Sequence, residues 1–222
     1  METRRSFIRT GGLVVLGVAG GLAGAEKVAA MSARRQRLGM IIDLNRCTGC
    51  QSCVVACKGQ DRTARGQFKT RLITVETDDS PARLVFTPVQ CNQCDNPPCV
   101  PACPVGAVFK LDNGIVVTDW DKCRSLGNCI KACPFEARFA DSRHGRKADK
   151  CDFCLGRLEK GLEPACVEAC SSGARIFGDF NHPQGEFALY LRRRKLAGRK
   201  AELKTRPNIR YVTIRRSQGG AG

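Results

Sequence analysis

Short apolar stretches along this chain alternate with polar segments that contain cysteine. The stretch Gly39–Asp43 has the sequence Gly-Met-Ile-Ile-Asp, and Cys47 follows four residues later. The stretch Gly114–Asp119 repeats this arrangement ahead of Cys123. A short apolar run bounded by turn-forming residues has the length of a buried strand. We therefore expect two buried strands, each leading into a cysteine loop.

Two further stretches have the character of a half-buried strand. Within residues 58–90, which have an alternating character, Leu72–Val75 and Arg83–Phe86 are rich in strand-forming residues, and an acidic segment with a proline separates them. This pattern predicts two strands joined by a turn. The insertion that contains them, residues 58–90, is either a lid over the neighbouring cysteine loop or a surface for a partner subunit. Asn113-Gly114, between two apolar runs, predicts a further hairpin.

The helical segments are expected to be short. We expect Val54–Cys57 to open a helix, and the loop over 155–164 to contain a helical turn. Near the end of the chain, Arg210–Ile214 has the composition of a strand, for which we expect a position at the edge of a sheet. Short strands, short helices and small β-hairpin insertions together indicate an α+β fold.

Composition adds a constraint on how such a fold is stabilised. The chain has 222 residues, of which 15 are cysteine, 23 glycine and 10 proline, and aromatic residues make up 6%. A chain this poor in large apolar side chains is expected to be stabilised by metal centres. A disulfide framework and structural zinc are the alternatives. Both explain the pattern less well, because the cysteines recur in close groups followed by one further cysteine.

The cysteines form four runs, at residues 47–57, 91–103, 123–133 and 151–170. Three close cysteines and a fourth, often followed by proline, are the ligand run of a bacterial-type ferredoxin. The first three wrap one iron–sulfur cluster, and the fourth reaches the other cluster of a pair. The pattern predicts tandem ferredoxin-like units of the 2[4Fe-4S] type, one nested inside the other.

The third run lacks one ligand. The position three residues after Cys123 and three before Cys129 is Leu126. A leucine side chain has no atom that binds iron. Three thiolates suit a [3Fe-4S] cluster, in which the iron at the missing thiolate is absent. The alternatives are a [4Fe-4S] cluster with a water ligand, or no cluster at this site.

The first 30 residues have the features of a twin-arginine export signal. Arg4 and Arg5 precede an apolar stretch, Gly11–Ala25, and small residues suited to cleavage. The apolar stretch is too short and too rich in glycine to span a membrane well. Because the twin-arginine route carries folded proteins, clusters can be inserted in the reducing cytoplasm. We expect a periplasmic protein that contacts the membrane through a partner.

The formal net charge of +16 is concentrated towards the end of the chain. From Tyr190 onwards there are 11 lysines or arginines and one glutamate. We describe residues 181–222 as a basic C-terminal extension, which is either a solvated face or a docking surface for an acidic partner or anionic headgroups. No nucleic-acid-binding motif accompanies this charge, so nucleic acid is not an expected partner.

Three stretches identify a resemblance to a known family. They are Asp43–Cys53, Cys94–Pro104 and Pro164–Cys170. With them, the chain resembles the four-cluster iron–sulfur subunit of the dimethyl sulfoxide reductase family over residues 38–180. Within that family, the subunits of tetrathionate, thiosulfate and polysulfide reductases are the most similar.

The resemblance implies a ligand set for each cluster, because in that family the outer runs pair with each other and so do the inner runs. The four sets are Cys47, Cys50, Cys53 and Cys170; Cys57, Cys151, Cys154 and Cys166; Cys91, Cys94, Cys99 and Cys133; and Cys103, Cys123 and Cys129. Leu126 occupies the vacant place of the fourth set. Nitrate reductase relatives have tryptophan at the matching place and hold a three-iron cluster, whereas sulfur-compound reductases usually have cysteine.

The function implied by the resemblance is electron transfer without catalysis, and the sequence shows no nucleophile–base pair, phosphate loop or flavin motif. Three [4Fe-4S] clusters and one [3Fe-4S] cluster would relay electrons within a respiratory reductase. The first cluster would face a molybdenum or tungsten catalytic subunit, and the fourth a quinol-linked integral membrane subunit. The alternative is the same role in a complex without molybdenum, such as a multihaem cytochrome, a hydrogenase or a sulfur-cycle membrane complex.

Overall fold

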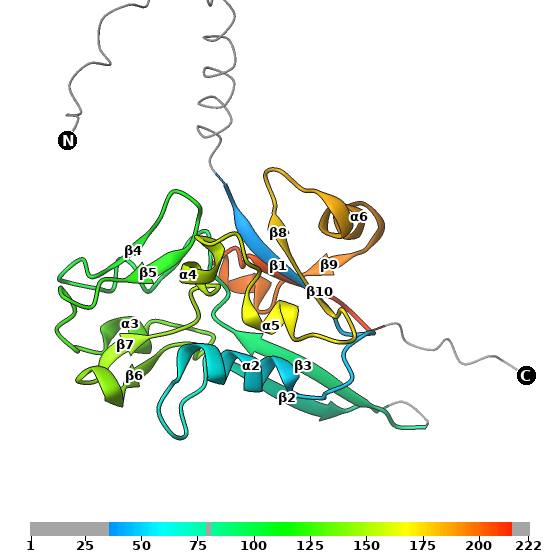
Figure 1. Cartoon of the computed structure of the whole chain (residues 1–222), viewed down its shortest axis with the longest axis horizontal. Helices are drawn as coiled ribbons and strands as arrows, with labels where there is room; N and C mark the ends of the chain where they lie inside the picture. Colours follow the sequence, from blue (N-terminus) through cyan, green and yellow to red (C-terminus); the bar gives the residue numbers. More distant parts are fainter. Residues whose placement is uncertain (1–35, 79–80, 215–222) are drawn as a thin grey trace, which may run out of the picture. The chain divides into compact units, whose positions relative to one another are not determined.

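The computed structural model describes residues 36–78 and 81–214, which belong to one compact unit of the chain (Figure 1). The export signal expected over residues 1–30 lies outside the described residues. The strands of the described chain are β1 (Leu38–Asp43), β2 (Thr70–Glu76), β3 (Leu84–Gln90), β4 (Val108–Lys110), β5 (Val116–Thr118), β6 (Phe139–Asp141), β7 (Lys147–Asp149), β8 (Arg175–Asp179), β9 (Leu196–Ala197) and β10 (Ile209–Val212). Its helices are α2 (Ser52–Asp61), α3 (Asn128–Lys131), α4 (Leu155–Leu158), α5 (Ala165–Glu168) and α6 (Gly185–Arg193).

A four-stranded sheet is built around β1, in the order β8-β1-β10-β9. Strand β1 pairs antiparallel with β8 and parallel with β10. Its residues Met40, Ile41 and Ile42 are completely buried. A strand covered on both faces needs apolar side chains at successive positions, which explains the unbroken apolar run in the sequence.

The prediction of an edge position for the last strand was wrong. Strand β10 lies between β1 and β9, so it is an interior strand. Only two residues of β9, Leu196 and Ala197, pair with it. A strand of two residues has no recognisable period, so the sequence pattern does not reveal that this edge is covered.

The two faces of this sheet have different neighbours, because successive side chains of a strand point to opposite faces. Met40 and Ile42 pack in a core with Phe153 and three of the cysteines. Ile41 packs on the other side with residues of α6, among them Phe187. One face of the sheet therefore supports cysteines, and the other is covered by α6.

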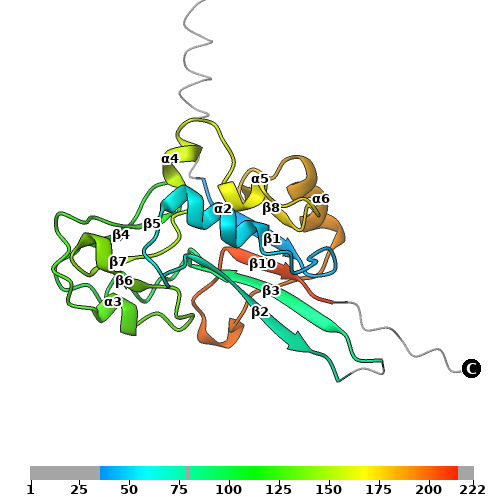
Figure 2. The same ribbon diagram turned by 60° about the horizontal axis from the view of Figure 1, so that its bottom comes forward.

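Three separate hairpins complete the fold: β2–β3, β4–β5 and β6–β7, each an antiparallel pair. Figures 1 and 2 show β4–β5, β6–β7 and α3 gathered at one end, with the four-stranded sheet and α6 at the other. Helices α2 and α5 lie between these ends and pack on each other. Among the residues described, no helix has the length and apolar character needed to cross a membrane.

The β2–β3 hairpin occupies the region in which alternation predicts two strands and a turn. Phe86 of β3 packs against Gly49 in the first cysteine loop, with a ring carbon 2.6 Å from where a Cβ atom on Gly49 would lie. Gly49 also has a positive φ of 75°, so glycine satisfies both the backbone and the space. Farther along, Ile73, Val75 and Leu84 are exposed. The hairpin thus contacts the first cysteine loop while leaving other apolar side chains uncovered.

Candidate metal centres

Helix α2 presents two cysteines of the first run to two different surroundings. Cys53 and Cys57 are four residues apart on this helix, and both are buried. Cys47 and Cys50 lie in the loop before it. Cys50 is exposed, and its hydrogen bonds with Ser52 lower the pKa of its thiol. No other cysteine of the chain is exposed, and all 15 are free thiols.

The outer runs bring their thiols together in two places. Burial raises the pKa of Cys47, and the nearby thiols of Cys53 and Cys170 raise it further. A separate group forms around Cys57, whose pKa burial raises to about 12, with further contributions from Cys166 and Cys154.

Cys151 belongs to this second outer group. Burial raises its pKa well above that of an ordinary thiol, and the thiols of Cys57 and Cys166 raise it further. The thiol of Cys166 also has Cys53 and Cys170 as electrostatic neighbours. The two outer groups are therefore adjacent to each other.

The inner runs form two more groups. Burial raises the pKa of Cys94 to about 12, and the thiols of Cys91, Cys99 and Cys133 contribute to the shift. Burial likewise raises the pKa of Cys129, which has Cys103 and Cys123 as thiol neighbours. We number the groups from 1 to 4 in the following order: Cys47, Cys53 and Cys170; Cys57, Cys151, Cys154 and Cys166; Cys91, Cys94, Cys99 and Cys133; Cys103, Cys123 and Cys129.

Leu126 lies beside the three thiols of group 4. Its side chain lines one hollow together with Cys103, Cys123 and Cys129. Leu126 is 56% exposed, and Val105 on the same hollow is also exposed. The place expected to lack a ligand is therefore an apolar opening from group 4 to solvent.

The donor set fits iron–sulfur clusters better than single metal ions. Within the described ranges, no three Cys, His, Asp or Glu side chains are close enough to hold one ion. A cluster requires a wider arrangement, because each thiolate binds a different iron. The raised thiol pKa values also mean that metal binding has to displace protons, as it does at other thiolate sites.

Sequence reasoning did not identify three buried cations beside the thiols. Arg138, Arg175 and Lys150 are only 4%, 3% and 3% exposed. Burial by itself lowers the pKa of Arg175, but the thiolates of Cys166 and Cys53 raise it above its ordinary value. A repeated Ala-Arg, in which the arginine lies five residues after Cys133 and again after Cys170, was the available signal for both arginines.

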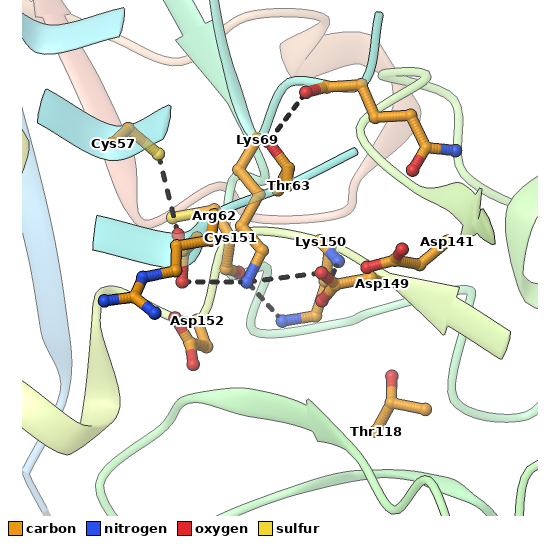
Figure 3. A network of polar contacts seen from close by, with 12 residues as sticks. Cys57, Arg62, Thr63, Lys69, Thr118, Asp141, Asp149, Lys150, Cys151 and Asp152 are labelled. Atoms are coloured by element: carbon orange, nitrogen blue, oxygen red, sulfur yellow. Dashed lines mark hydrogen bonds and ion pairs between the residues drawn. The ribbon is translucent and has the colours of Figure 1, made fainter. Parts of the chain in front are cut away.

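A different buried cation, Lys69, lies in an acidic network that joins outer and inner segments (Figure 3). Its ammonium group pairs with Asp61 of α2 at 3.2 Å and with Asp149 of β7 at 3.3 Å. Burial alone lowers the pKa of Lys69, but these carboxylates raise it above its ordinary value. Cys57 donates a hydrogen bond to Asp61 across 3.7 Å. Lys69 is thus neutralised locally, beside group 2.

Comparison with known proteins points to the same chemistry. Two family models, each described as a 4Fe-4S dicluster domain, match residues 35–107 and 82–180. A subunit of tetrathionate reductase from Salmonella typhimurium is 44% identical over 185 residues, covering 81% of this chain and 74% of the relative.

More distant relatives match a similar share of the chain. A subunit of sulfite dehydrogenase from Allochromatium vinosum is 35% identical over 205 residues, covering 82% of this chain and 85% of the relative. The iron–sulfur subunit of arsenate respiratory reductase from a Shewanella species is 31% identical over 224 aligned positions, covering 79% and 96%.

Proposed function

Because the chain belongs to the family of iron–sulfur subunits of dimethyl sulfoxide reductase-type complexes, we propose that it relays electrons through four clusters. The observation that carries this proposal is the division of the thiols into four neighbouring groups. When bound, iron–sulfur clusters supply one-electron oxidation and reduction. The protein holds them, shields them from water and sets their surroundings.

The ligand sets of this proposal are those implied by the family resemblance. Cys50 joins group 1 by its spacing from Cys47 and Cys53. The nested pairing of the runs is supported by the thiol neighbours, since outer thiols have outer neighbours and inner thiols have inner ones. In this arrangement α2 contributes Cys53 to one cluster and Cys57 to the next, which links the first two clusters rigidly.

For group 4 we propose a [3Fe-4S] cluster. Its hollow is lined by three thiols and Leu126, and no fourth cysteine lines it. Leu126 occupies the position of the missing thiolate, and its side chain offers no ligand that could hold a fourth iron. This reasoning favours loss of the fourth iron over its retention with water.

The partners in this proposal are a molybdenum or tungsten catalytic subunit near group 1 and a quinol-linked membrane subunit near group 4. Support for the second contact comes from Val105, Phe109 and Leu126, which are exposed apolar side chains in the segments around group 4. Exposed apolar patches commonly mark contacts with other proteins. The terminal oxidant is of the sulfur-compound or oxyanion type, as the names of the relatives suggest.

Iron content and spectroscopy of the protein purified without oxygen test the cluster assignment. We expect about 15 irons per chain, from three four-iron clusters and one three-iron cluster. An oxidised three-iron cluster has an odd number of electrons, so a paramagnetic signal should be present before any reductant is added. About 16 irons without that signal would contradict the three-iron assignment, and fewer than four redox-active centres would contradict the relay.

We propose that the protein acts in the periplasm after export through residues 1–30. The support is the twin-arginine pattern at Arg4 and Arg5. Replacing both with lysine should leave cluster-loaded protein in the cytoplasm. Normal export of that variant, measured by cell fractionation, would show that these residues are not the signal.

A further inference from the structure

Arg175 lies at the junction of groups 1 and 2. One terminal nitrogen of its guanidinium, Nη1, is 3.6 Å from the sulfur of Cys166 in group 2. Cys53 of group 1 is a further electrostatic neighbour of this side chain. The rest of its surroundings is neutral, since Nη1 donates to Gln90 at 3.2 Å and to the sulfur of Met40 at 3.4 Å.

Arg138 holds the corresponding place between groups 3 and 4. Cys99 and Cys91 of group 3 and Cys129 of group 4 are its electrostatic neighbours. It donates a hydrogen bond to the hydroxyl of Thr118 at 3.2 Å. Both arginines therefore face thiols of two groups at once.

Lys150 lies between groups 2 and 3, where the outer and inner units meet. Its ammonium donates to the carbonyl of Cys151, a group 2 residue, at 3.0 Å, and to the carbonyl of Val116. The same ammonium acts electrostatically on the thiol of Cys99 in group 3. Each of the three steps between neighbouring groups thus has one buried cation beside it.

These three charges lack compensation from acidic side chains. Within residues 36–78 and 81–214, no carboxylate forms an ion pair with any of them, in contrast to Lys69 with its two. Nε and Nη2 of both arginines are buried without a hydrogen-bond partner. A buried charge and buried N–H groups left in this state are costly. A thiolate-bound cluster among these cysteines would supply the acceptors and the negative charge that these groups lack.

The internal repeat shows that the arginines are not needed for the backbone at these places. Val108, Arg138 and Arg175 each follow a cysteine by five residues and an alanine by one. Val108 is as deeply buried as the arginines, at 3% exposed. An apolar side chain therefore fills this position in the third copy, and the two arginines require another explanation.

We propose that Arg175, Lys150 and Arg138 are positioning charges, each shared by two neighbouring clusters, that stabilise the reduced state of both. This inference rests on the proposed electron relay. Iron–sulfur clusters bound by thiolates carry net negative charge, and each reduction adds one electron without a bond being made or broken. A fixed cation in a site of low dielectric constant offsets that added charge and raises the reduction potential.

The test is a redox titration of the cluster-loaded chain, followed by paramagnetic resonance, for Arg175→Gln, Lys150→Gln and Arg138→Gln. In each variant the reduction equilibrium of two of the four centres should weaken at least tenfold, which lowers their midpoint potentials by about 59 mV for one electron. One shifted centre should be common to the Arg175 and Lys150 variants, and another to the Lys150 and Arg138 variants. The two remaining centres in each variant should keep their potentials.

Lys131→Gln is the matched control, because Lys131 is two residues from both Cys129 and Cys133 in the sequence but exposed to solvent, where water screens its charge. It should shift no potential. Arg175→Lys and Arg138→Lys keep the charge without the planar hydrogen-bonding group, and their potentials should stay near those of the unaltered protein. A full iron content with unshifted potentials in the glutamine variants, or shifts shared by all four centres, would overturn the proposal.

If Arg175→Gln or Arg138→Gln loses clusters, the matching lysine variant is titrated in its place, and Lys150→Arg serves the same purpose at position 150. A large fall in potential in the lysine variant would mean that hydrogen bonding, and not charge, sets the potential. The same experiments distinguish failure of this inference from failure of the proposed electron relay. Unaltered protein that lacks four redox-active centres would refute the proposed function, whereas failure of this inference leaves those centres in place.

Discussion

All four thiols of group 2 are buried, and two of them pack with residues of the four-stranded sheet, whereas Cys103 and Cys129 of group 4 pack with residues of the short hairpins β4–β5 and β6–β7. In the outer unit, Cys151 and Cys166 belong to the same core as Met40 and Phe153. In the inner unit, Cys103 and Cys123 are only partly buried, and Leu126 beside them is exposed. Group 2 is thus placed in a deep core, whereas group 4 lies nearer the surface.

This difference in burial suits the two groups to different roles in electron transfer. A deeply buried centre is protected from water and oxidants, but it exchanges electrons with outside partners slowly. A centre close to the surface can exchange electrons with a partner that docks over it. Group 2 is therefore suited to electron transfer within the protein, whereas group 4 is accessible to a partner through the hollow at Leu126.

The largest effects are expected from removing one cysteine ligand from group 2 and, in a separate variant, one from group 4. Cys166→Ser should lose about four irons and much of the thermal stability, because metal binding contributes directly to folding free energy at such sites. Cys123→Ser should lose only the irons of group 4 and leave the outer sheet folded. Iron analysis and a thermal melt of both variants measure this. Equal destabilisation by the two variants would show that the inner site is as important for the fold as the outer one.

The next largest effect is expected from a substitution that gives group 4 a fourth cysteine, as the other groups have. Leu126→Cys supplies a thiolate at the vacant place, so iron should rise from about 15 to about 16 per chain. The paramagnetic signal of the oxidised protein should disappear, and the potential of that centre should fall because a further thiolate adds negative charge. Leu126→Ser is the control, since it changes polarity without adding a thiolate. A persistent signal in the cysteine variant would contradict the three-iron assignment.

A smaller effect is expected at Asp95, which ties the inner unit to the outer one. Its carboxylate pairs with Arg37 at 2.7 Å, accepts a hydrogen bond from Asn208 at 2.9 Å and pairs with Lys110 of β4 at 3.2 Å. Asp95→Asn should destabilise the fold by about 1.5–3 kcal/mol, the usual range for a lost hydrogen bond to a charged group. Asp112→Asn, at an exposed place in the next hairpin, should change little.

The effect at Asp95 should depend on pH. Burial alone raises the pKa of this carboxyl, but the hydrogen bond from Asn208 and the charge of Arg37 lower it below its ordinary value overall. Because the folded-state pKa lies below the unfolded one, the stabilisation is complete above about pH 4 and is lost as the pH falls through the folded value. Thermal melts at pH 7 and near pH 2 should show the difference from Asp95→Asn shrinking at the lower pH. A constant difference would rule out the ionic contribution.

The smallest effect on stability is expected on α6. Arg192 and Arg193 are exposed at its end, while Phe187 and Tyr190 hold the helix to the sheet. Replacing both arginines with glutamate should change stability by no more than about 0.5 kcal/mol, as exposed substitutions usually do. If this surface docks an acidic partner or anionic headgroups, the variant should leave the assembled complex at lower salt. Retention unchanged across a salt series would favour a solvated face.

The local features of the candidate site could be predicted from the sequence. The four runs, the lack of a thiol at Leu126 and the apolar strand over Gly39–Asp43 depend on residue type and on the spacing of near neighbours. A thiolate loop is a local structure, and three cysteines a few residues apart are already constrained to surround one centre. The short strand is likewise visible because each of its central residues is apolar.

Only the tertiary structure decided which long-range neighbours each residue has. The interior position of β10 depends on pairing with β1, at the opposite end of the described chain, and with the two residues of β9. The shared position of Arg175 between Cys53 and Cys166 has the same origin, since α2 and β8 meet only in the folded chain. The reason is physical: ligand chemistry is a property of a side chain, whereas burial and electrostatic partnership arise from packing between distant segments.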